Sequence, residues 1–147
     1  MTEITANSGA LYPKAKATRQ LVDPVAFVLA MVGAPLLVGI VGAPLILIPS
    51  IATLLGGPIY LMVGIPVMLI YMAHRKVSPR RWAGVALLGH LALFTPIFLV
   101  IHFTDQHRTN EWPFIFLSFG SVFAPLWGAI SGVIYRKLEH DFYKQSI

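Results

Sequence analysis

The chain has 147 residues and a formal net charge of +5; 56% of its residues are hydrophobic, 12% are charged, and the mean hydropathy is +0.74. A water-soluble domain of this size would aggregate with so few charges, so the composition predicts an integral membrane protein. The absence of cysteine excludes disulfides, thiolate nucleophiles and cysteine-ligated metals. The high pI, about 9.8, does not indicate nucleic-acid binding, because little polar sequence remains to form a binding face.

Residues 1–24 form a polar N-terminal tail, and two membrane spans are expected to follow it. Asp23 and Pro24 predict the N-cap and the first residue of a helix. The next charged residue is Arg75, which leaves 51 residues without Asp, Glu, Lys or Arg. One span needs about 20 apolar residues, so this segment holds two. We place the helices at 25–47 and 51–72, with a tight turn at 48–50.

The first of these segments contains the pentapeptide VGAPL twice, with Pro35 and Pro44 nine residues apart. That spacing is two and a half helical turns, so the two prolines point to opposite faces and do not form one site. We interpret them as kinks in an apolar helix. An alternative ends the first helix near Ala43, leaves residues 44–57 as a re-entrant or interfacial segment, and starts the second helix at Pro58. We favour the division into two full spans.

Two further charge-free segments, residues 82–103 and 113–135, contain 22 and 23 residues and predict the third and fourth spans. The predicted fold is therefore an all-α polytopic membrane protein. Four transmembrane helices joined by short loops occupy residues 25–136, and residues 137–147 form a C-terminal tail. Aromatic residues at the predicted helix ends are expected in the headgroup region: Tyr71, Trp82, Trp112 and Tyr135.

The basic residues predict the orientation. Ten of the 11 lysines and arginines fall on one side of the predicted spans, and only Arg108 falls on the other. By the positive-inside rule both termini are cytoplasmic, and we place this multi-pass protein in the inner membrane of a bacterium. The cytoplasmic loop between the second and third helices is also expected to contact anionic lipid, through Arg75, Lys76, Arg80 and Arg81.

Small residues recur at every fourth position of the fourth span, at Gly120, Ala124, Gly128 and Gly132. Small side chains at this spacing form a groove that lets another helix backbone approach closely. The pattern predicts close helix contact, and the contacting helix belongs either to this chain, to a second copy or to another membrane subunit.

His90 is the one ionisable residue near the middle of a predicted span. We favour a structural imidazole, hydrogen-bonded to Thr95, Ser118, Ser121 or a carbonyl freed by Pro96, over a proton relay or ligand. A bis-histidine haem needs facing imidazoles from two helices, and no other predicted span contains a histidine. No cofactor is therefore expected.

One outer-loop cluster holds two imidazoles and two carboxylates, which are possible ligands of a divalent metal: His102, Asp105, His107 and Glu111. Their spacing matches no established metal motif. We favour the interpretation that a short polar loop keeps these side chains solvated.

The spans contain no Asp or Glu, which argues against proton-coupled export of cations. No arrangement of carboxylates, nucleophile and base, or clustered arginines indicates an enzyme. We therefore expect a non-catalytic subunit or assembly factor of a larger membrane complex, with lipid and other membrane subunits as partners. The alternative is a homo-oligomeric transporter or pore whose path contains polar side chains of the last two helices: His90, Ser118, Ser121 and Ser131.

Overall fold

The computed structural model describes residues 22–44, 47–104 and 111–144, and the regular secondary structure in these ranges is entirely helical. The four helices are α1 (Pro24–Gly42), α2 (Ile48–His74), α3 (Pro79–Thr104) and α4 (Trp112–Lys144). Each is long and apolar enough to cross a membrane. The predicted all-α fold with four membrane-spanning helices is thus confirmed.

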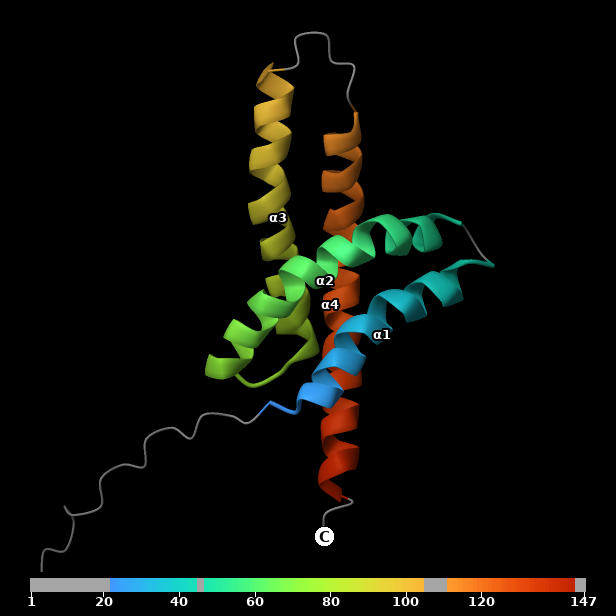
Figure 1. Cartoon of the computed structure of the whole chain (residues 1–147), viewed down its shortest axis with the longest axis vertical. Coiled ribbons are helices and arrows are strands. Elements are labelled where there is room, and N and C mark those ends of the chain that lie inside the picture. Colours follow the sequence, from blue (N-terminus) through green and yellow to red (C-terminus); the bar gives the residue numbers. More distant parts are fainter. Residues whose placement is uncertain (1–21, 45–46, 105–110, 145–147) are drawn as a thin grey trace, which may run out of the picture.

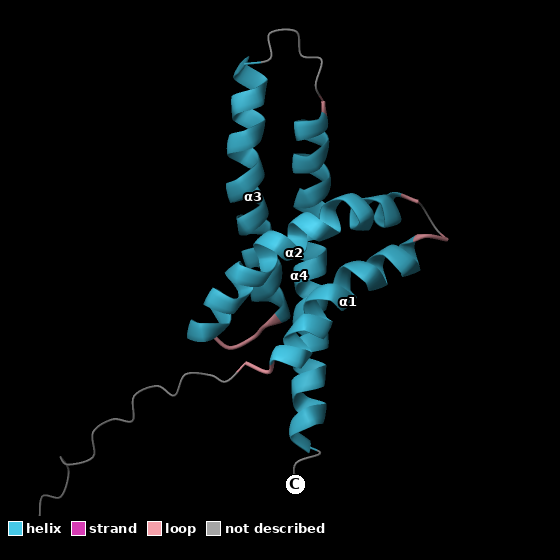
Figure 2. Cartoon of the chain, in the orientation of Figure 1, coloured by secondary structure: helices cyan, strands magenta, loops and turns pink. Residues whose placement is uncertain are grey.

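The helices form two hairpins that cross each other. Helices α3 and α4 run side by side, whereas α1 and α2 form a second, oblique pair that covers only part of them (Figure 1). Residues 75–78 connect α2 to α3 as a short loop (Figure 2). The start of α1 and the end of α4 lie at the same end of the molecule (Figure 1). That this end faces the cytoplasm stays a prediction.

The start of α1 follows directly from the sequence. The Asp23 carboxylate accepts hydrogen bonds from the backbone N–H groups of Val25 and Ala26, at 2.9 and 3.1 Å, and Pro24 is the first helical residue. These bonds satisfy donors that have no partner within the helix. The predicted N-cap is therefore confirmed.

The connection between α1 and α2 differs from the expected one. Helix α1 ends at Gly42 instead of residue 47, and the predicted turn at 48–50 is the first turn of α2. A Cβ atom on Gly42 would lie 2.5 Å from the Cβ of Pro49, so the two helices meet where only glycine fits. Pro44, which lacks an N–H group, therefore lies beyond the end of α1 and is not a kink inside it.

Helix α2 passes through Gly57 and Pro58 without a break. The alternative is right that the first helix ends near Ala43. Its re-entrant segment is wrong, because residues 48–57 belong to the same 27-residue helix as the rest of this span. A proline removes one ladder hydrogen bond, and a membrane helix tolerates that loss when neighbouring groups compensate.

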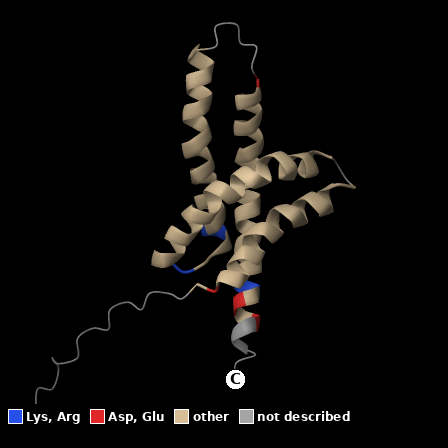
Figure 3. Ribbon diagram, in the orientation of Figure 1, with Lys and Arg blue, Asp and Glu red and all other residues tan. Residues whose placement is uncertain are grey.

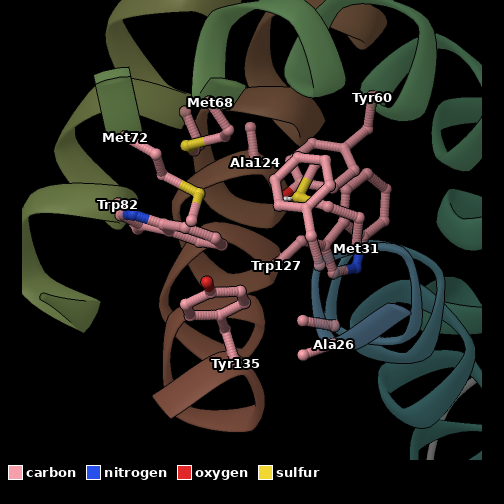
Figure 4. Packing of buried hydrophobic residues seen from close by; sticks show 12 residues of the cluster. Ala26, Met31, Tyr60, Met68, Met72, Trp82, Ala124, Trp127 and Tyr135 are labelled. Carbon is pink, nitrogen blue, oxygen red and sulfur yellow. Dashed lines mark hydrogen bonds between the residues drawn. The ribbon is translucent and has the colours of Figure 1, made fainter. Parts of the chain in front are cut away.

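The buried core lies where the two hairpins cross and draws on all four helices. The Trp82 and Tyr135 rings, 0% and 1% exposed, lie 5.8 Å apart between centroids and face each other in Figure 4. Both rings are therefore enclosed by protein instead of being exposed to lipid, and their expected depth at the headgroup region stays a prediction. They are buried because α3 and α4 pack against each other at this end. Trp112, in contrast, is exposed, as expected for an interfacial ring. Tyr71 is partly buried.

Candidate functional site

The small residues of α4 pack against α3 of the same chain. A Cβ atom on Gly128 would lie 2.7 Å from the carbonyl oxygen of Trp82, and one on Gly132 would lie 2.9 Å from the Cα of Pro79. Helix α3 thus approaches α4 at backbone-contact distance, which larger side chains would prevent. The predicted contacting helix could belong to this chain, to a second copy or to another subunit. Gly128 and Gly132 contact a helix of this chain.

Gly120, at the far end of the stripe, makes room for the ring of His90. A Cβ atom there would overlap that ring. The His90 Nε2 atom lies 3.2 Å from the carbonyl oxygen of Leu117, and the ring stacks on Phe94 with centroids 4.7 Å apart. The imidazole is therefore held between α3 and α4, as a structural role predicts. Its partner is a backbone carbonyl of α4, and neither Pro96 nor any of the three hydroxyls named as candidates is involved.

The serines that were candidates for a polar path lie in three different surroundings. The Ser131 hydroxyl is buried 3.3 Å from the Tyr60 hydroxyl, so either group can donate. Ser121 donates to the Leu117 carbonyl at 2.6 Å, within its own helix, and Ser118 is exposed. These hydroxyls do not share one lining with His90.

Two hydroxyls of α2 also hold the α1–α2 hairpin together. Ser50 donates to the carbonyl of Gly39 at 2.9 Å, and Thr53 donates to that of Pro35 at 3.0 Å. These bonds cross between helices, where sequence alone could not pair them.

An apolar groove of about 290 Å³ lies between α2 and the α3–α4 hairpin, and sequence analysis missed it. Its lining comes from three segments, residues 48–68 of α2, 85–94 of α3 and 112–127 of α4. No charged side chain lines it, and its polar side chains are His90, Tyr60 and the Trp112 and Trp127 indoles. The sequence did contain a pattern that could have indicated this groove. Five lining residues of α2 are spaced four positions apart and so lie on one face of the helix: Ala52, Gly56, Tyr60, Gly64 and Met68.

Small residues from two helices are part of the lining of this groove. Ala52 and Gly56 contribute from α2, and Ala86 and Gly89 contribute from α3. A Cβ atom added to Gly89 would meet nothing within 4 Å, so that position faces open space. The groove can therefore accept an apolar group close to the backbone of α3.

The possible metal ligands are not brought together in the described structure. His102 is exposed on the last turn of α3, with its ring stacked on Phe98 at 5.4 Å. Glu111 lies just before α4, while Asp105 and His107 lie outside the described residues. The geometry gives no support to a metal site here, and its absence stays a prediction.

The basic residues of the described chain gather at one end of the helices (Figure 3). Arg75 and Lys76 follow α2, Arg80 and Arg81 lie in the first turn of α3, and Arg136 lies on α4. The basic residues of the N-terminal tail lie outside the described residues. This distribution is the one from which the cytoplasmic orientation was predicted.

Comparison with models of known protein families, with curated proteins and with solved structures finds no match to this chain. The function is therefore inferred from the geometry of the chain itself.

Proposed function

We propose that this multi-pass membrane protein is a non-catalytic subunit or assembly factor of a larger membrane complex, and that its apolar groove binds a transmembrane helix of another subunit. The observation that carries the proposal is the groove itself, about 290 Å³, whose lining includes small residues of α2 and α3. Small residues at a helix interface allow close backbone approach and are typical of helix–helix contacts in membranes.

The unequal covering of the helices supports a partner in the groove. Helices α3 and α4 extend beyond α1 and α2 at one end of the molecule (Figure 1). Large apolar side chains there are exposed, Phe103 at 79% and Phe114 at 60%. A single partner helix along the groove would cover the open side between α2 and this hairpin.

The use of the polar groups favours a binding role over transport or catalysis. His90 and Ser121 both bond to the Leu117 carbonyl, and Ser131 bonds to Tyr60. A water-filled path needs polar groups directed along it, and acid–base chemistry needs a positioned acid or base. Two polar atoms of described groove-lining side chains are unused, the buried Trp127 indole nitrogen and the second nitrogen of the His90 ring. Two such atoms form neither a line of polar groups nor a positioned acid–base pair. The inner-membrane location and cytoplasmic termini form part of the proposal.

The first test is purification of the tagged full-length protein from its native membrane in mild detergent, followed by native mass spectrometry. We expect other membrane proteins in a fixed stoichiometry with this chain. An assembly of copies of this chain alone would contradict the proposal and favour the homo-oligomeric pore.

A matched pair of variants then tests the groove. Gly84 and Gly89 both lie on α3, and at either position an added Cβ atom would meet nothing within 4 Å, but only Gly89 lines the groove. We expect Gly89→Leu to reduce partner recovery at least ten-fold, about 1.4 kcal/mol of binding free energy, and Gly84→Leu to leave it within two-fold. Equal recovery with both variants, at equal thermal stability, would show that the partner binds elsewhere.

A further inference from the structure

A second hollow, of about 140 Å³, lies at the basic end of the helices. We call it the basic hollow; it is lined by residues that precede α1, end α2, begin the α2–α3 connection and belong to α4. They are Val22, Met72, Arg75, Lys76, Val77, Tyr135, Arg136 and Glu139. Segments from both hairpins therefore meet there, although they lie far apart in the sequence.

The charges around the basic hollow are unbalanced. Arg75, Lys76 and Arg136 contribute three positive charges, and Glu139 contributes one negative charge. Within the described residues the one ion pair is His140–Asp141, so no described carboxylate lies within 4.0 Å of these three cationic groups. Three cationic side chains beside one hollow favour a bound anion there.

The basic hollow is apolar where it meets the membrane-spanning part. Met72 and Tyr135, 3% and 1% exposed, belong to the buried core, and Val22 and Val77 add apolar surface beside them. The cationic residues come directly after the apolar part of α2 and near the end of that of α4. This arrangement matches the headgroup level of a bilayer, where a lipid phosphate lies next to hydrocarbon.

We propose that the basic hollow binds the headgroup of an anionic phospholipid, with the phosphate held by Arg75, Lys76 and Arg136. Guanidinium groups suit phosphate because their planar fork donates two parallel hydrogen bonds. Basic pockets between membrane helices bind anionic headgroups for the same reason. The site differs from the anionic-lipid contact expected from sequence, since it includes Arg136 of α4 and excludes Arg80 and Arg81, which do not line the hollow.

The test uses the purified full-length protein in neutral detergent, titrated with phosphatidylglycerol or phosphatidylcholine and followed by native mass spectrometry. We expect a preference for phosphatidylglycerol that the double variant Arg75→Gln, Arg136→Gln reduces at least ten-fold, since each charge removed from beside the bound phosphate weakens binding about five-fold. The matched control is Arg80→Gln, Arg81→Gln, which removes the same charge from the same end of the helices. It should change the affinity less than three-fold.

Two further measurements separate a lipid site from its alternatives. Glu139→Gln should strengthen phosphatidylglycerol binding, because it removes the negative charge at the hollow. Equal losses in the two double variants would overturn the proposal, because they would indicate diffuse surface attraction. Displacement of the lipid by millimolar glycerol phosphate or inorganic phosphate would also overturn it, by showing that the ligand is a soluble phosphate. Unchanged melting temperatures in all the variants exclude misfolding as the cause.

Discussion

Among its neighbours, helix α4 contacts α3 and α2 in opposite ways. Against α3 it places glycines at backbone-contact distance, whereas against α2 it places Phe119, Phe123 and Trp127, and the groove remains between them. Both contacts are mainly apolar, and each includes a polar bond, His90 to Leu117 or Tyr60 to Ser131, so polarity does not distinguish them. The comparison shows that side-chain size determines which helix pair closes and which stays open, because in a membrane packing replaces the hydrophobic effect as the source of association.

The largest expected effect is loss of the α3–α4 contact in Gly128→Leu. The new side chain would overlap the backbone of Trp82 and the Cβ of Ala86, and backbone cannot move aside as a flexible side chain can. We expect the variant to be destabilised by about 3 kcal/mol or more, measured as a fall in melting temperature by circular dichroism in detergent. The control is Gly84→Leu on α3, where an added Cβ atom would meet nothing within 4 Å. Equal melting temperatures for both variants would contradict the close contact.

A smaller effect is expected where α4 meets a side chain instead of backbone. Gly120→Ala should be destabilised by about 1–3 kcal/mol, because the added methyl group occupies the place of the His90 ring. Combining it with His90→Ala should recover part of that loss, since the two groups no longer compete. The coupling free energy from a double-mutant cycle is the measurement. Additive effects of the two substitutions would mean that the ring does not lie over Gly120.

The smallest effect concerns the contact of α2 with the core. Tyr60→Phe removes the hydroxyl near Ser131 and should lower the free energy of unfolding by about 1 kcal/mol. Ser131→Ala should have a similar effect, and the double variant should lose little more than either single variant. Stability is measured by chemical denaturation in detergent. If the double variant lost as much free energy of unfolding as the two single variants together, the two hydroxyls would not bond to each other.

The two copies of VGAPL show where local sequence stops determining structure. Pro35 of the first copy is buried inside α1, while Pro44 of the second lies beyond the end of that helix. The pentapeptides are identical, so the difference comes from their surroundings. Gly42 of the second copy faces Pro49 in the closest approach of α1 and α2, whereas Gly33 of the first has only Ile134 near it, at 3.8 Å.

Trp82 and His90 illustrate the same limit at the candidate site. A tryptophan at the end of an apolar segment suits the headgroup region by composition, yet the approach of α4 buries Trp82 completely. For His90 a hydrogen-bond partner was predictable, because one imidazole among apolar residues needs one. Its partner, the Leu117 carbonyl, lies 27 positions away in the sequence and depends on how α3 and α4 are aligned.

The sequence by itself determined the four apolar segments, their approximate limits and the Asp23 N-cap, because hydrocarbon thickness fixes span length and charged residues stay out of the hydrocarbon. Only the tertiary structure decided which face of each helix meets protein, where α1 ends, and that an apolar groove and a basic hollow exist. The physical reason is that lipid and protein interior are both apolar, so a membrane helix carries little hydropathy contrast between its buried and lipid-facing sides.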